Sequence, residues 1–203
     1  MSRALPLVAA FCALTLAGCP SGQRPFIKTG FRIPGTVAVL PLNNMTNSLG
    51  GALYVRDKLT IYVRDVRGWT VADEAKVDAG LRTLAITDGG QLNASTPQKI
   101  SQATGAPVLL YTDLVEFGYT TLGFINTKKC RARIRVVDGA TGELLYSAEG
   151  HGAESGTAVS GGDALKAGAG ALGGQLADKA VGKPLANQVE DMLDELFEWL
   201  PRN

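Results

Sequence analysis

The sequence predicts an α/β fold in which helices cover one face of a mixed sheet. Two observations lead to this class. The first half of the chain alternates short apolar, β-branched runs with segments of helical apolar spacing, and the second half carries three consecutive strand-like runs. The predicted order is therefore β-α-β-α-α-β-β-β, followed by C-terminal helices.

Residues 1–18 are predicted to be a secretory signal peptide. Arg3 supplies a positive charge, and an almost wholly apolar run over residues 4–15 follows it. A run this short cannot cross a bilayer core, which needs about 20 residues. The small residues that come next are typical of a cleavage site, so we expect removal of this segment rather than a structural helix.

The cleavage site consists of Leu16, Ala17, Gly18 and Cys19, which resemble the lipobox of bacterial lipoproteins. The resemblance implies cleavage before Cys19, a diacylglyceryl group on its thiol and a third acyl chain on its new amino group. Two or more chains hold a protein stably at a membrane. The alternative is ordinary cleavage that leaves Cys19 as a free thiol. Pro20 stands where an aspartate would favour the inner membrane, so we expect the outer membrane, with the domain facing the periplasm.

The composition of the mature chain excludes one class of partner. Removing residues 1–18 leaves 185 of the 203 residues, and the loss of Arg3 leaves 19 basic and 19 acidic side chains. A net charge of zero argues against nucleic acid as a partner. Cys130 is then the one cysteine besides the lipidated Cys19, so no intrachain disulfide is expected and the thiol is predicted to be buried and inert.

The first elements follow from apolar spacing and from proline and glycine. Residues 19–35 contain prolines, glycines and scattered charge without an apolar period, and they are predicted to be a lipidated tether. A buried strand is expected over residues 36–42. Residues 49–66 carry apolar side chains at helical spacing, and Gly68 ends that helix.

The next segment predicts a short strand and two helices. The strand covers residues 69–72, and Asp73 caps the helix that follows it. Residues 86–94 are expected to form a loop. Pro97 at a first helical position then begins a short helix that Gly105 ends.

Three strands complete the predicted sheet. They cover residues 108–119, 127–138 and 143–149, and a tight turn over residues 138–142 joins the last two. These strands end the predicted periplasmic α/β domain, which spans residues 36–150.

The middle of these strands alternates apolar and basic side chains, which predicts one packed and one solvated face. The apolar set is Cys130, Ala132, Ile134 and Val136, and the basic set is Lys129, Arg131, Arg133 and Arg135. The arginine ladder, Arg131, Arg133 and Arg135, is either a docking face for an anion, an acidic partner or peptidoglycan, or an ordinary solvated sheet face.

The last third of the chain predicts two different segments. Residues 151–183 are rich in glycine and alanine, which indicates either a helix that packs closely on a neighbour or a flexible linker. Residues 184–203 are predicted to be an amphipathic C-terminal helix whose polar side is acidic. Acidic side chains disfavour a membrane surface, so this helix should dock on protein. The opposite charges suggest the hypothesis that it covers the arginine ladder, within one chain or between two.

No catalytic residue, metal ligand set or cofactor site is predicted. His151 is the single histidine, which excludes a zinc site with several histidines. The sequence has no Gly-x-Ser-x-Gly nucleophile motif and no glycine-rich phosphate loop after its first strand. We therefore expect a protein that is not an enzyme.

Several runs resemble known envelope lipoproteins. Residues 37–44, Val-Ala-Val-Leu-Pro-Leu-Asn-Asn, resemble the opening strand and loop of CsgG-like lipoproteins and of the amino-terminal domain of the Tol-system propeller protein. Residues 103–111, 133–138 and 142–147 are similar to an uncharacterised lipoprotein family encoded beside CsgG-like proteins. The resemblance implies an α/β domain, self-association and a place in a multi-lipoprotein assembly, and it transfers no catalytic residue.

These observations predict a non-enzymatic outer-membrane lipoprotein that binds protein partners in an envelope secretion or assembly complex. The expected partners are other envelope lipoproteins, CsgG-like ones among them, and further copies of the chain. The alternative is a lipoprotein that activates a peptidoglycan synthase.

Overall fold

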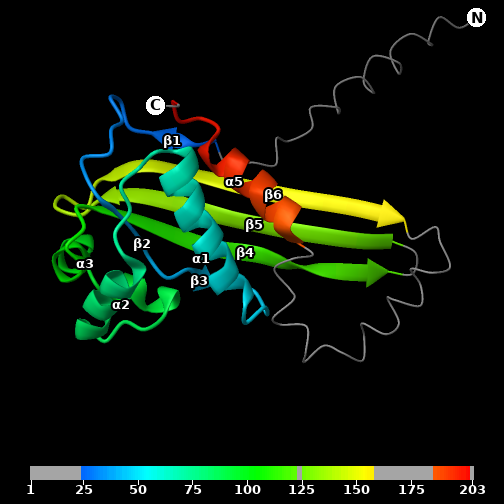
Figure 1. Cartoon of the computed structure of the whole chain (residues 1–203), viewed down its shortest axis with the longest axis horizontal. Coiled ribbons are helices and arrows are strands. Elements are labelled where there is room, and N and C mark those ends of the chain that lie inside the picture. Colours follow the sequence, from blue (N-terminus) through cyan, green and yellow to red (C-terminus); the bar gives the residue numbers. More distant parts are fainter. Residues whose placement is uncertain (1–23, 123–124, 158–184, 202–203) are drawn as a thin grey trace, which may run out of the picture.

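The centre of the structure is a long antiparallel meander of three strands (Figure 1). It consists of β4 (Val108–Leu122), β5 (Ile125–Asp138) and β6 (Leu144–Thr157). The computed structural model describes residues 24–122, 125–157 and 185–201. The arginine ladder and the apolar set of β5 (Cys130, Ala132, Ile134 and Val136) lie on opposite faces of the sheet, as their alternation predicts.

Three shorter strands complete an open mixed sheet in the order β1-β6-β5-β4-β2, with β3 also on β4. β2 (Val37–Val39) and β3 (Asn43–Asn44) run parallel to β4, whereas β1 (Phe26–Ile27) is antiparallel to β6. The predicted α/β class with a mixed sheet and a C-terminal helix is confirmed.

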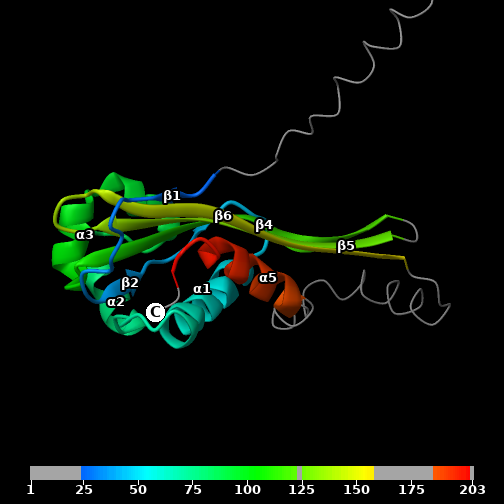
Figure 2. The same ribbon diagram turned by 90° about the horizontal axis from the view of Figure 1, so that it is seen from above.

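Two helices lie side by side on one face of the meander (Figures 1 and 2). They are α1 (Gly51–Ile61), which continues into the π-helical turn η2 (Tyr62–Val66), and α5 (Ala186–Phe197). Their apolar side chains and those of the sheet form the larger core. The members from α5 and its flanks are Leu185, Val189, Met192, Leu193, Leu196, Phe197 and Leu200.

A second, smaller core lies on the other face of β2 and of the first part of β4. It packs α2 (Glu74–Thr83), the 3-10 segment η3 (Gly89–Ala94) and α3 (Pro97–Thr104) against Ala38, Leu40 and Leu109. All positions from Val37 to Leu40 are at most 3% exposed. Parallel strands are usually buried on both faces. The predicted arrangement, with helices on one face, therefore holds for the meander, whereas β2 has helices on both of its faces.

The structure differs from the sequence prediction in several boundaries. Phe26–Ile27, inside the segment predicted to be a tether, forms β1, and Phe31 and Ile33 pack on the larger core. The predicted strand at residues 69–72 is reduced to a single bridge between Val71 and Val37. β6 continues to Thr157, beyond the predicted domain end at residue 150. Most of the Gly/Ala-rich segment, residues 158–183, lies outside the described residues.

The helix ends follow the predicted capping residues. The Asp73 carboxylate accepts a hydrogen bond from the Lys76 backbone N–H. Thr96, immediately before Pro97, accepts one from the Lys99 backbone N–H through its hydroxyl. Gly105 ends α3 with a φ of 70°, a left-handed conformation that glycine adopts without steric cost. The polar caps thus fix where α2 and α3 begin, and with them one wall of the groove described next.

Candidate functional site

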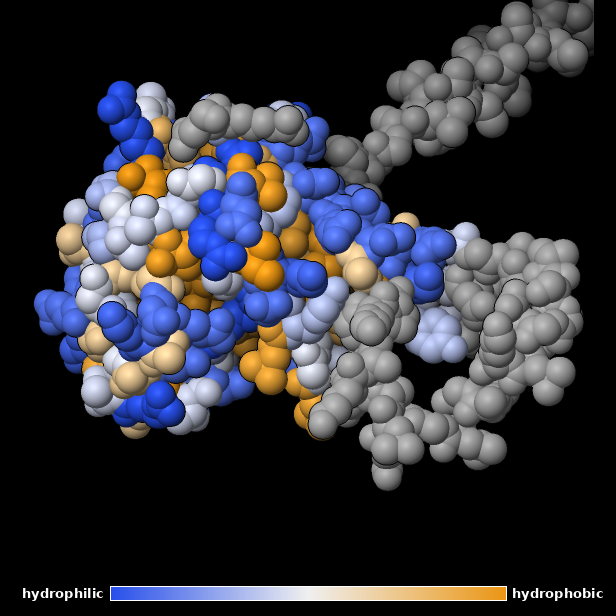
Figure 3. All heavy atoms as spheres, in the orientation of Figure 1, coloured by the Kyte–Doolittle hydropathy of each residue, from blue (hydrophilic) through white to orange (hydrophobic). Residues whose placement is uncertain are grey.

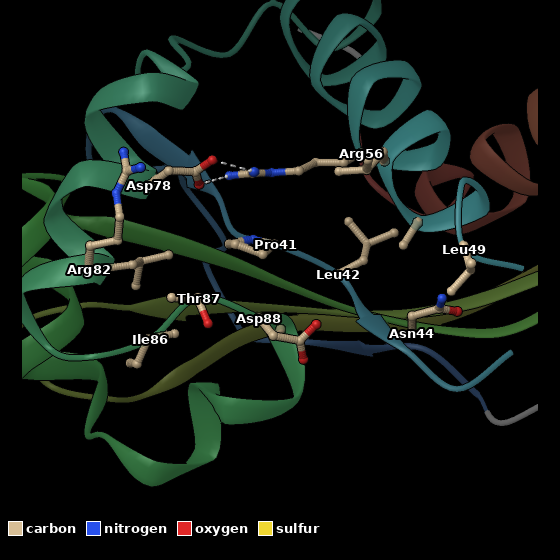
Figure 4. Close-up of a pocket in the computed structure, with 14 residues that line it drawn as sticks. Pro41, Leu42, Asn44, Leu49, Arg56, Asp78, Arg82, Ile86, Thr87 and Asp88 are labelled. Carbon is tan, nitrogen blue, oxygen red and sulfur yellow. Dashed lines mark hydrogen bonds and ion pairs between the residues drawn. The ribbon is translucent and has the colours of Figure 1, made fainter. Parts of the chain in front are cut away.

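A groove of about 450 Å³ lies between α1 and α2 (Figure 4). Pro41 and Leu42, which follow β2, line its base, and Ile86, Thr87 and Asp88 line the side beneath α2. We call it the α1–α2 groove. The remaining lining residues are Asn44, Leu49, Ala52, Leu53, Arg56, Asp78, Leu81, Arg82 and Gly89.

A buried arginine holds the two walls of the groove together. Arg56 of α1 is 4% exposed, and its guanidinium makes a bidentate pair with Asp78 of α2 at 2.8 and 3.1 Å. The same group donates to the Val39 carbonyl at 3.0 Å and pairs with Glu74 at 3.0 Å. A planar guanidinium suits this arrangement because its donors point along fixed directions. Arg56 therefore joins β2, α1 and α2.

The rim of the groove carries large apolar side chains that are open to solvent. Leu49 is 82% exposed and Leu53 is 71% exposed, and both line the groove. Met45, in the loop before α1, is 61% exposed as well. Figure 3 shows apolar surface over the loop that leads into α1. Neighbouring exposed apolar side chains on a soluble domain commonly mark a contact surface.

The apolar side chains at helical spacing over residues 49–66 do not all face the core. Leu59 and Val63 are buried, whereas Leu53 is exposed and Leu49 precedes the helix. α1 begins at Gly51 and turns Val55, Leu59 and Val63 toward the core, together with Arg56. The buried arginine interrupts the apolar stripe, because an ion-paired guanidinium takes a place where the pattern expects a hydrophobic side chain.

The arginine ladder is paired with carboxylates across the strands and not with the C-terminal helix. Arg131 contacts Glu116 at 2.8 Å and Glu149 at 3.1 Å, and Arg133 contacts Glu149 at 2.9 Å. The guanidinium of Arg135 lies 5.1 Å from the ring centre of Tyr111, within cation–π range. The hypothesis that the acidic helix of the same chain covers the ladder is wrong, since α5 packs on the opposite face of the sheet.

Two glycines bring α5 close to that opposite face. A Cβ on Gly152 would overlap the Gln188 carbonyl, and a Cβ on Gly150 would overlap the Met192 carbonyl. Gly150 and Gly152 are buried whereas His151 between them is exposed, so the two glycines form the surface on which α5 packs. The Tyr146 hydroxyl also donates to the Leu196 carbonyl at 2.7 Å, and burial raises the pKa of Tyr146 to about 12.

The remaining candidates for chemistry are few in the described part of the chain. His151 is exposed, and its Nδ1 lies 2.6 Å from a carboxylate oxygen of Glu195. Cys130 is 1% exposed beneath Met192, and burial raises the pKa of its thiol to about 12. Among residues 24–122, 125–157 and 185–201, no three His, Cys, Asp or Glu side chains converge as metal ligands would.

The predicted lipid-attachment residue, Cys19, and the preceding Leu16, Ala17 and Gly18 lie outside the described residues. Within the described ones, every helix is too short or too polar to cross a bilayer.

Comparison with known proteins gives a family match over most of the chain. The model of the family described as "Putative lipoprotein GNA1162-like" matches residues 31–196. The chain is 27% identical over 148 residues to "Putative lipoprotein NMB1124/NMB1162" of Neisseria meningitidis serogroup B, which covers 70% of this chain and 67% of the relative.

A solved structure shows the same fold. The crystal structure of lipoprotein GNA1162 from Neisseria meningitidis superposes with a TM-score of 0.56 at 22% identity, covering 71% of this chain and 99% of that one. The PelC dodecamer from Paraburkholderia phytofirmans gives a TM-score of 0.46 at 16% identity, covering 68% of this chain and 84% of that one. By the family match over residues 31–196, the chain belongs to the GNA1162-like family of lipoproteins.

Proposed function

We propose that this protein is a non-enzymatic outer-membrane lipoprotein whose periplasmic domain binds protein partners of the cell envelope through the α1–α2 groove. The observation that carries the proposal is the apolar rim formed by Leu49 and Leu53. Both side chains line the groove and are at least 71% exposed, opposite a wall in which Arg56 and Asp78 are ion-paired. An apolar segment of a partner would fit such a groove, with the rim removed from water on binding.

The family and the amino-terminal sequence support the membrane anchor. The family is one of lipoproteins by its description, and the sequence offers Cys19 behind an apolar leader. The charges of the groove wall, Arg56 and Asp78, are paired with one another, which suits a fixed binding surface. The proposed partners are other envelope lipoproteins, CsgG-like ones among them, and further copies of the chain.

The anchor is tested by fractionating cells that express the wild type or Cys19→Ala, with mass spectrometry of the mature amino terminus. We expect an acylated Cys19 in the outer-membrane fraction of the wild type, and an unacylated protein released from that fraction in the variant. Two or more acyl chains give stable attachment, so the difference should be nearly all-or-none. A wild-type protein that is unmodified and soluble would refute the anchor.

The groove is tested by Leu49→Asp combined with Leu53→Asp. Both side chains are exposed, so the free energy of unfolding should change by only about 0.5 kcal/mol or less, whereas capture of partners by in-cell crosslinking should be lost. Val66→Asp is the matched control, since Val66 is 60% exposed on η2, away from the residues that line the groove. Unchanged crosslinking in the double variant, or equal loss in the control, would exclude the groove as the binding site.

The same crosslinking experiment distinguishes a component of an envelope assembly from an activator of a peptidoglycan synthase. An assembly component should crosslink to other lipoproteins and to itself. An activator of a peptidoglycan synthase should crosslink directly to that enzyme, as a single copy.

A further inference from the structure

We infer that the outer face of the sheet, the face of β4–β6 opposite α1 and α5, rests on the anionic phospholipid surface to which Cys19 tethers the chain. This inference rests on the proposed anchor. It assigns to the arginine ladder and to β1 a ligand of stated chemistry, the phosphate groups of the bilayer that carries the protein.

The first step is the shortness of the link between the anchor and the sheet. Arg24 is five residues beyond Cys19, so their Cα atoms can be at most about 18 Å apart. Two residues later, β1 pairs with β6 through Phe26–Ser147 and Ile27–Tyr146. The sheet therefore lies within one short reach of the lipid, and the edge strand β1 is the part held nearest to it.

The second step identifies the face of the sheet that lies beside the anchored segment. Phe26 lies opposite Ser147, and Ser147 lies opposite Arg135, so the three side chains share one row on the outer face. Phe26 is 46% exposed, an apolar side chain beside the predicted membrane anchor. Figure 2 shows the sheet edge-on, with α1 and α5 together on one side. On the outer face the smaller core and η3 reach as far as Tyr111 and Arg135, and no helix of the described residues covers this face farther along the meander.

The third step is charge. Arg24, Arg133 and Arg135 line one hollow of about 150 Å³ on this face. The two carboxylates beside them are already engaged: Glu149 accepts from Arg131 and Arg133, and Asp113 accepts from Asn43.

The arginines keep donors for a ligand. The described contacts of Arg133 use its Nε, and those of Arg135 use the face of its guanidinium, so terminal N–H groups of both remain for an anion. Guanidinium groups bind phosphate oxygens in pairs. Lipid phosphate groups would accept hydrogen bonds from the arginines that line the hollow. Phe26 nearby can enter the headgroup region, as aromatic side chains do at membrane interfaces.

The test uses the mature chain, residues 19–203, with Cys19→Ser, so that no lipid anchor contributes. The protein is floated with vesicles of neutral phosphatidylcholine, or with vesicles containing an equal part of anionic phosphatidylglycerol, at about 0.01 M salt, where the screening length is about 30 Å. We expect flotation with the anionic vesicles alone, and its loss at 0.15 M salt.

The variant Arg24→Gln with Arg135→Gln should bind the anionic vesicles about 25-fold more weakly, since each arginine contributes about fivefold. Lys58→Gln with Arg64→Gln removes the same charge from α1 and η2 on the other side and should bind as the wild type does. Thermal unfolding of each variant checks that it is folded.

Absence of wild-type flotation at low salt, equal flotation with neutral vesicles, or equal weakening in both variant pairs would overturn the inference. So would a wild type that sediments with isolated peptidoglycan and does not float. None of these results depends on whether Cys19 is acylated in cells, so a failure here is distinguishable from a failure of the anchor.

Discussion

Gly152→Val is expected to detach α5 from the sheet and to destabilise the fold by about 3 kcal/mol or more, the upper range for overpacking a core. The added side chain would need the space that the Gln188 backbone now occupies, and backbone cannot rotate away as a flexible side chain can. α5 would have to lift, and six buried residues between Gln188 and Phe197 would lose their contacts.

Cys130 reports this movement directly. Its sulfur lies 3.3 Å from that of Met192, and in the Cys19→Ser background it is the single thiol of the mature chain. Because burial raises the pKa of Cys130 to about 12, the wild type should react with a maleimide only very slowly near neutral pH. The Gly152→Val protein should react at a rate close to that of the unfolded chain.

Ala153→Val is the control for the added volume. Ala153 is the next residue of β6 and is exposed, so a β-branched side chain there suits the strand and should leave both stability and thiol reactivity unchanged. A Gly152→Val protein with wild-type thiol reactivity would show that α5 does not sit on this glycine.

Arg56→Met is expected to lower the free energy of unfolding by about 3 kcal/mol, since hydrogen bonds to charged groups contribute about 1.5–3 kcal/mol each. Methionine keeps the length of the apolar stem but removes the donors that reach Val39, Asp78 and Glu74. The loss is measured as the urea midpoint at an unchanged slope, because the unfolded state should expose the same surface.

Substitutions of the acidic partners show how much of the stability loss in Arg56→Met comes from each ion pair. Asp78 and Glu74 are 37% and 47% exposed, so Asp78→Asn and Glu74→Gln should each cost about 1 kcal/mol or less. Arg56→Lys retains the charge without the planar fork and should fall between these and methionine. An Arg56→Met protein as stable as the wild type would mean that α1 and α2 are held by their apolar contacts alone.

Local sequence patterns predicted the elements whose signals are local. The alternation in β5, the proline and glycine that bound α3, and the turn before β6, where Gly142 has a φ of 76°, all depend on neighbours within a few residues. The order of strands and helices, and hence the fold class, follows from such signals.

The remaining features depend on partners far along the chain. Phe26–Ile27 is too short to show an apolar period, and it becomes a strand only because the edge of β6 is available to it. Arg56 resembles any surface arginine until Asp78, 22 residues later, comes beside it. The one usable clue to the seat of α5 was the pair Gly150 and Gly152, since glycines two apart on one strand face leave room for a close helix.

The position of α5 also determines when the domain can finish folding. The helix and its flanks, residues 185–200, follow every strand of the sheet, yet seven of them fill the larger core against strands that precede them by some thirty residues or more. A chain made from its amino terminus would present every strand of the sheet before this helix. Until α5 arrives the larger core lacks those seven side chains, so the sheet alone would leave its inner face open and the arrival of α5 would complete the core.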